Sequence, residues 1–154
     1  MGNEETFVTS GCYATMTGMK ENNRAYSSLQ DSEMERPLVV VLEDDSANAW
    51  GLSLVLQDWG YRTVIGDSVD PVLAQLDAAE EVPAAAVCDF HLADGEDGVT
   101  AARTLQERYG RDVAVVIMTG SSGRTARQQA CNQGFPLLSK PVDPDTLQTY
   151  LPAA

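Results

Sequence analysis

The stretch LVVVLEDD, residues 38–45, decides how the rest of the chain is interpreted. Its first five residues are apolar and rich in valine, which predicts a strand buried on both faces, as in a parallel sheet. Parallel sheets place their ligands at the carboxyl ends of the strands, so we expect the polar residues that follow such strands to converge. Four apolar runs end in this way: 38–42 before Glu43, Asp44 and Asp45, 84–88 before Asp89, 113–118 before Thr119, and 137–138 before Ser139 and Lys140.

Segments with helical spacing of apolar residues separate these runs. The alternation predicts five strand–helix units, with right-handed crossovers and helices on both faces of the sheet. We therefore expect an α/β fold of the flavodoxin-like (βα)5 class, a doubly wound parallel sheet with strand order 2-1-3-4-5. Besides the four runs, we expect a strand at 61–65 and helices at 46–59, 70–79, 98–109, 122–133 and from 143 to Pro152, with Asp70 and Pro71 starting the second helix.

The domain boundary is expected at Pro37. Residues 1–36 are rich in Asn, Glu, Ser, Thr, Gly and Met without a lasting periodic pattern, which predicts a flexible tail or linker. Residues 37–154 are then one domain, and 44% apolar residues in a chain of 154 are enough for a proper core. No output domain is expected after the last helix, so we expect the downstream effector to be another protein or another part of a longer chain.

Charge and cysteine content exclude several classes of function. The formal net charge of −13 would repel nucleic acid and anionic lipid, so we expect no binding to nucleic acid or to membranes. Three cysteines at unrelated spacings indicate neither a disulfide framework nor a zinc site. We expect a cytoplasmic protein, since neither a signal peptide nor a membrane span is indicated.

The residues at the strand ends suit phosphoryl transfer. Carboxylates packed within a few ångströms repel one another by about 4 kcal/mol per close pair at an effective dielectric near 20, a cost that a divalent cation removes. Oxygen ligands of this kind suit Mg²⁺. Asp89 could then attack phosphorus as a nucleophile, while Lys140 and the Thr119 hydroxyl stabilise the charge on the transferred group.

Five elements in this order resemble the receiver domain of two-component response regulators. They span residues 38–152 and comprise the acidic cluster 43–45, Asp89, the loop 92–98, Thr119-Gly120 and Lys140-Pro141. The resemblance implies that Asp89 is the phosphoacceptor, that Thr119 and Lys140 assist, and that the Lys140-Pro141 peptide bond is cis. It implies Mg²⁺ held by Glu43, Asp44, Asp89 and the backbone carbonyl of His91. The implied function is to accept a phosphoryl group from a histidine kinase or phosphotransfer protein and to relay a signal by conformational change, without being an enzyme beyond self-phosphotransfer and slow autodephosphorylation.

Three features depart from the common family pattern. Ala93 stands where proline is usual, and the loop 92–98 is about one residue longer, a form similar to the receivers of hybrid histidine kinases. Leu137 replaces the aromatic residue that usually couples to the threonine, so an aromatic switch is not expected. Receivers commonly dimerise through their last two helices. Here the fourth helix is polar and Pro152 shortens the fifth, so we expect a monomer.

Individual residues also have simpler interpretations. Asp45 is expected to cap the first helix rather than bind metal, because acidic residues favour helix N-termini. Asp94, Glu96 and Asp97 are expected to be solvated loop charges. Trp50, early in the first helix and off its core stripe, is expected on the surface that docks the phosphodonor protein.

Two other functional classes remain open on the residues alone. A phosphatase of the haloacid dehalogenase type uses the same Asp, Thr, Lys and Mg²⁺ chemistry, but it needs a second acid two residues after the nucleophile, where this chain has His91. A pseudo-receiver or other flavodoxin-like interaction module would not be regulated by phosphorylation. The complete set of Asp89, Thr119 and Lys140 disfavours such a module.

Overall fold

The computed structural model describes residues 35–120 and 123–154 of the chain. The predicted tail 1–36 therefore lies, apart from its last two residues, outside the described residues. The description below concerns the unit formed by residues 36–154.

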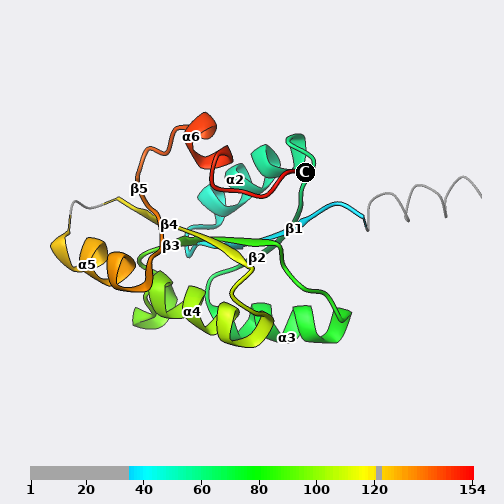
Figure 1. Cartoon of the computed structure of the whole chain (residues 1–154), viewed down its shortest axis with the longest axis horizontal. Helices are drawn as coiled ribbons and strands as arrows, with labels where there is room; N and C mark the ends of the chain where they lie inside the picture. Colours follow the sequence, from blue (N-terminus) through cyan, green and yellow to red (C-terminus); the bar gives the residue numbers. More distant parts are fainter. Residues whose placement is uncertain (1–34, 121–122) are drawn as a thin grey trace, which may run out of the picture. The chain divides into compact units, whose positions relative to one another are not determined.

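Five parallel strands form one sheet in the order β2-β1-β3-β4-β5 (Figure 1). This confirms the predicted strand order and places the switch point between β1 and β3. In β1 every side chain is at most 3% exposed, as expected for a strand covered on both faces. The strands are β1 (Leu38–Leu42), β2 (Arg62–Gly66), β3 (Ala85–Asp89), β4 (Ala114–Thr119) and β5 (Leu137–Ser139).

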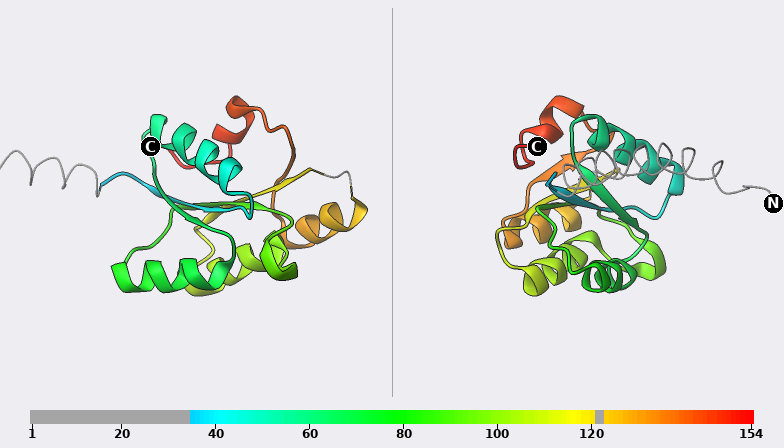
Figure 2. Two further views of the ribbon diagram at one scale, coloured as in Figure 1. Left: turned by 180° about the vertical axis from the view of Figure 1, so that it is seen from behind. Right: turned by 90° about the vertical axis from the view of Figure 1, so that its right-hand side faces the viewer.

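Helices cover both faces of the sheet, with α2 and α6 on one face and α3, α4 and α5 on the other (Figures 1 and 2). The alternation of side chains along β1 serves the two layers: Val40 packs in the core with α3, α4 and α5, and Val39 in the core with α2 and α6. The helices are α2 (Ser46–Asp58), α3 (Val69–Ala79), α4 (Gly98–Tyr109), α5 (Arg124–Gln133) and α6 (Pro144–Gln148), with a 3-10 turn η1 (Ala93–Gly95).

Several predicted starts differ from the structure by one residue, since β3 begins at Ala85 rather than at residue 84 and β4 at Ala114 rather than at residue 113. The second helix begins at Val69 with Ser68 as its N-cap, so Asp70 and Pro71 lie inside its first turn, where proline is tolerated. The second strand begins at Arg62 rather than at Tyr61, whose buried hydroxyl donates a hydrogen bond to the carbonyl of Pro152. Among the helices of the described residues, none is long and apolar enough to cross a bilayer.

Candidate functional site

The three acidic residues after β1 differ in burial and in their hydrogen bonds. The backbone N–H of Glu43 donates to the Gly66 carbonyl at 3.0 Å and so continues the pairing of β1 with β2. The Glu43 side chain is buried at 4% exposure, whereas Asp44 is exposed. Asp45 accepts a hydrogen bond from the Asn48 backbone N–H at 2.9 Å and caps α2, which confirms its expected structural role.

The side chain of Lys140 bridges Glu43 and Asp89. Its Nζ lies 2.7 Å from Glu43 Oε2 and 3.0 Å from Asp89 Oδ2, so that one ammonium bridges two nearly buried carboxylates. Asp89 is the last residue of β3 and is 8% exposed. The structure thus brings together three residues that are 97 and 51 positions apart in the chain, as predicted from the strand ends.

Burial and charge act in opposite directions on this cluster. Burial raises the pKa of the Glu43 carboxyl, and the hydrogen bond from Lys140 only partly offsets it. For Lys140, burial opposes the charged form, but hydrogen bonds to Glu43 and Asp89 outweigh it, and the pKa of the ammonium is raised. Burial therefore dominates for Glu43, and the two hydrogen bonds dominate for Lys140.

The cluster offers an oxygen donor set for a cation. One carboxylate oxygen from each of Glu43, Asp44 and Asp89 can be chosen so that all three lie within 4.8 Å of one another. Lys140 brings one positive charge to these three acids. Hard divalent cations such as Mg²⁺ take oxygen ligands of this kind, so the residues present fit such an ion.

Thr119 ends β4 beside this cluster. The register pairs Asp89 with Met118, which places Thr119 one residue further along the neighbouring strand. Thr119 is 3% exposed, and its carbonyl accepts a hydrogen bond from the Lys140 backbone N–H at 2.8 Å. The Lys140-Pro141 bond is cis, as the family resemblance implied.

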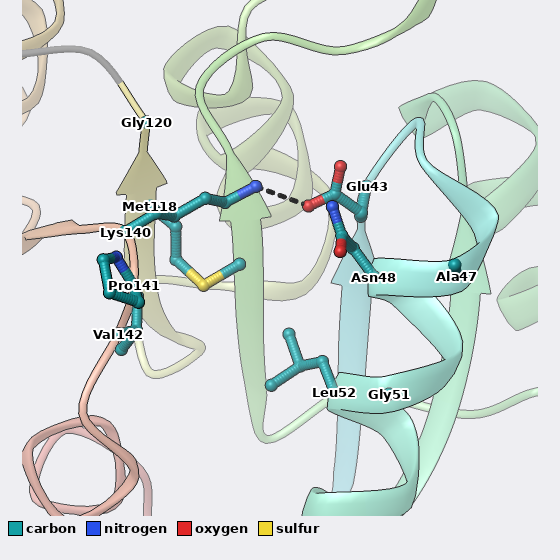
Figure 3. A pocket seen from close by; sticks show the side chains of 10 residues that line it. All are labelled: Glu43, Ala47, Asn48, Gly51, Leu52, Met118, Gly120, Lys140, Pro141 and Val142. Atoms are coloured by element: carbon teal, nitrogen blue, oxygen red, sulfur yellow. Dashed lines mark hydrogen bonds and ion pairs between the residues drawn. The ribbon is translucent and has the colours of Figure 1, made fainter.

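A pocket of about 560 Å³ opens next to the cluster, between the start of α2 and the segment after β5. Figure 3 shows Lys140 reaching across it to Glu43, with Asn48 of α2 beside the carboxylate. The walls of the pocket come from the residue after β1, from α2, from the end of β4 with the residue after it, and from the segment after β5: Glu43, Ala47, Asn48, Gly51, Leu52, Met118, Gly120, Lys140, Pro141 and Val142.

In the segment between β3 and α4, two acidic side chains that were expected to be solvated make hydrogen bonds to backbone N–H groups. Asp97 accepts a hydrogen bond from the Thr100 N–H at 2.7 Å and caps α4, and Glu96 Oε2 accepts one from the Val69 N–H at 3.1 Å. The expectation of solvated charge is therefore wrong for Glu96 and Asp97, while Asp94 is exposed as expected. His91 is exposed and pairs with Asp97 in an isolated antiparallel bridge, and its predicted role as a carbonyl ligand stays a prediction.

Gly98 is a residue that sequence reasoning missed. A Cβ at this position would lie 2.0 Å from the Asp89 carbonyl oxygen, closer than any real contact, so only glycine lets α4 begin against the end of β3. Its N–H donates to the Phe90 carbonyl at 2.8 Å. The position of Gly98 at the start of a predicted helix, where glycine adds no helix propensity, was the available signal.

Comparison with known proteins identifies the family of this fold and site. The profile of the response regulator receiver domain matches residues 39–152. The chain belongs to this family. It is therefore a phospho-acceptor domain of the two-component signalling type, with the flavodoxin-like fold of such receivers.

Relatives and solved structures agree with this assignment. The receiver domain is 33% identical over 113 residues to the DNA-binding transcriptional regulator NtrC of Salmonella typhimurium, 73% of this chain and 23% of NtrC. It is 30% identical over 117 residues to the transcriptional regulatory protein ZraR of Escherichia coli, 75% of this chain and 26% of ZraR. The chain thus spans about a quarter of the length of these relatives.

Among solved structures, the signal receiver domain of a modulated diguanylate cyclase from Desulfovibrio desulfuricans matches with a TM-score of 0.64 and 26% identity, over 75% of this chain and 90% of that one. A putative response regulator from Chloroflexus aurantiacus matches with a TM-score of 0.64 and 25% identity, over 75% and 93%. None of these four proteins is a haloacid dehalogenase-type phosphatase. The expected likeness to hybrid kinase receivers stays a prediction.

Two glycine substitutions test the close approach at Gly98. Gly98→Ala should lower the free energy of unfolding by about 1–3 kcal/mol, because the new methyl group forces β3 and α4 apart. The new methyl group of Gly51→Ala, in the middle of α2, meets nothing within 4 Å. This substitution should instead raise the free energy of unfolding by at most about 1 kcal/mol, because alanine favours the helix more than glycine does. Urea unfolding of both variants measures the contrast, and a Gly98→Ala protein as stable as the parent would contradict the packing argument.

Proposed function

We propose that Asp89 accepts a phosphoryl group from a phosphohistidine of a histidine kinase or phosphotransfer protein, and that the domain then signals by a change of conformation. The observation that carries this proposal is the bridge from Lys140 Nζ to both Asp89 and Glu43 at the carboxyl edge of the sheet. A nucleophile, a cation and further carboxylates lie within one small site there. Such an arrangement suits transfer of a highly charged group.

The reaction requires one bond to form and one to break. A carboxylate oxygen of Asp89 attacks phosphorus in line, the bond from phosphorus to the histidine nitrogen breaks, and that nitrogen keeps the electron pair and takes up a proton. The product on Asp89 is an acyl phosphate. Lys140, which now holds Asp89 Oδ2, can pass to a phosphoryl oxygen, and the Thr119 hydroxyl at the end of β4 can bind another.

Glu43, Asp44, Asp89 and the His91 carbonyl would hold Mg²⁺ in this proposal. When bound, the ion supplies the positive charge that offsets both the carboxylates and the transferred phosphoryl group. Lys140 alone supplies one charge, held by Glu43 and Asp89. The same residues would allow self-phosphotransfer from small donors and slow hydrolysis of the acyl phosphate by water.

The change of conformation would work without an aromatic switch. Leu137 of β5, at the position of that switch, is only partly buried and packs against the core on the α3, α4 and α5 side. The coupling that remains is through Lys140, whose backbone is bonded to Thr119 and whose side chain is bonded to Asp89.

An exposed apolar stripe on α2 would dock the phosphodonor. Trp50 is 62% exposed, Leu54 59% and Val55 38%, on the helix that also forms one wall of the pocket beside Lys140. Surface aromatic residues of this kind are enriched in protein interfaces. We propose the helical bundle of a histidine kinase or phosphotransfer protein as the occupant, acting in the cytoplasm on a monomeric domain.

Modification at Asp89 is tested with a small phosphodonor and Mg²⁺. The parent should gain one phosphoryl group that hydroxylamine removes, because acyl phosphates react with this nucleophile. Asp89→Asn should gain none, as its amide is not a nucleophile, and intact mass spectrometry measures both proteins. A label of the same stoichiometry on Asp89→Asn would place the acceptor elsewhere.

The metal assignment is tested by thermal unfolding with and without Mg²⁺. At ten times its Kd the ion should stabilise the parent by about 1.4 kcal/mol. Asp44→Asn should raise the stability of the metal-free protein, since one repelling carboxylate is removed, and should abolish the stabilisation by Mg²⁺. If millimolar Mg²⁺ leaves the parent unchanged, the cluster is not a magnesium site.

Docking through α2 is tested by separating the two kinds of donor. Trp50→Ala should slow transfer from a cognate phosphohistidine protein about tenfold, the size typical of an interface aromatic residue, and leave transfer from small donors unchanged. Val82→Ala is the matched control, because Val82 is 65% exposed but lies before β3, at the opposite edge of the sheet. Equal loss with both donors would show that Trp50 supports the fold, and a dimer in light scattering would contradict the monomer.

A further inference from the structure

The loop between β3 and α4 is a narrow hairpin that carries His91. The N–H of Gly98 donates to the Phe90 carbonyl, and the N–H of Leu92 donates to the Glu96 carbonyl at 3.0 Å. Its tip turns through Asp94, which has a positive φ of 57°. The Phe90 N–H donates to the Met118 carbonyl of β4 at 2.7 Å, which ties the base of the hairpin to the sheet, whereas the residues near its tip depend on other contacts.

The part of the hairpin near its tip contacts the segment that leads into α3. The Glu96 carboxylate accepts a hydrogen bond from the Val69 N–H at 3.1 Å, and the Ala93 N–H donates to the Asp67 carbonyl at 3.3 Å. Val69 is the first residue of α3, and the N-cap Ser68 makes no capping bond with its side chain. Glu96 therefore satisfies one of the backbone N–H groups at the N-terminus of α3, where the side chain of the N-cap satisfies none.

This position is electrostatically unfavourable for a glutamate. Burial raises the pKa of the Glu96 carboxyl, the Val69 N–H lowers it, and the neighbouring Asp70, Asp97 and Asp67 raise it further. The bond to the N-terminus of α3 is the interaction that offsets this repulsion, since the positive end of a helix attracts a carboxylate.

We propose that Glu96 is a positioning residue for the phosphorylation site: by capping α3 from the neighbouring loop, it fixes the hairpin that carries His91 beside Asp89. The inference rests on the proposed function, in which the His91 carbonyl faces the cation. Leu92, which is bonded to the Glu96 carbonyl, is the next residue after His91, so release of Glu96 frees the hairpin close to the ligand.

The test measures Mg²⁺ affinity by calorimetry in the whole chain. Glu96→Ala should weaken binding about tenfold, the lower end of the range for residues that orient a metal ligand. Glu96→Gln keeps an oxygen acceptor for Val69 and should bind like the parent. Asp94→Asn is the control for charge, because it removes a carboxylate from the same loop and asparagine tolerates a positive φ.

Amide hydrogen exchange distinguishes positioning from mere stability. In metal-free Glu96→Ala, exchange should accelerate at both Leu92 and Val69. Acceleration at Val69 alone, with unchanged Mg²⁺ affinity, would mean that Glu96 only stabilises α3 and would overturn the inference. Should Glu96→Ala fail to fold, Glu96→Asp, one methylene too short to reach Val69, takes its place.

Three further outcomes of the affinity measurement would each overturn the inference. Equal weakening in Glu96→Ala and Glu96→Gln would show that charge acts rather than the hydrogen bond, and the inference would be wrong. Mg²⁺ binding by the parent with no change in Glu96→Ala would overturn this inference and leave the proposed function intact. A parent that binds no Mg²⁺ would overturn the metal assignment and this inference with it.

Discussion

Compensation of negative charge at the carboxyl edge of the sheet is the constraint on which the site depends. Glu43 and Asp89 are almost fully buried, and a buried carboxylate without a partner is costly. The single ammonium of Lys140 serves both, at 2.7 and 3.0 Å. Since Lys140 follows the short strand β5, that strand must lie beside β4 at the same edge, and its pairing with β4 meets this requirement. The charge balance of the site therefore depends on the strand order, because the pairing of β5 with β4 brings Lys140 to the buried carboxylates.

The second constraint is steric and acts on the chain just after the nucleophile. Asp89 must end β3, and the chain must then leave the sheet and return within a few residues to begin α4 at Gly98, against the Asp89 carbonyl. A side chain at Gly98 would displace the strand end that carries the carboxylate. The hairpin between these residues is in turn held by Glu96 at the start of α3. The position of the loop between β3 and α4 thus depends on contacts with β3, α3 and α4.

The contrast between what sequence predicted and what it missed follows from the range of the interactions. The strand order, the role of Asp45 as a helix cap and the convergence of Lys140 with Glu43 follow from local patterns combined with the rules for parallel sheets. Glu96 and Gly98 act through contacts with segments that no periodic pattern connects to them. A glutamate in a polar loop looks the same in the sequence whether it is solvated or caps a neighbouring helix. Only the folded chain distinguishes the two cases.

The packing of the helices bears on where the effect of phosphorylation can travel. Helix α5 buries only Ala126 and Ala130, whereas α3 buries two valines and Leu76. Burial of apolar surface contributes about 25 cal/mol per Å², so two alanines hold a helix far less firmly than larger aliphatic side chains do. The chain reaches α5 from Thr119, whose carbonyl is bonded to the backbone of Lys140. A rearrangement that begins when Lys140 changes partner is therefore transmitted through Thr119 towards α5, a helix that costs less to displace than α3.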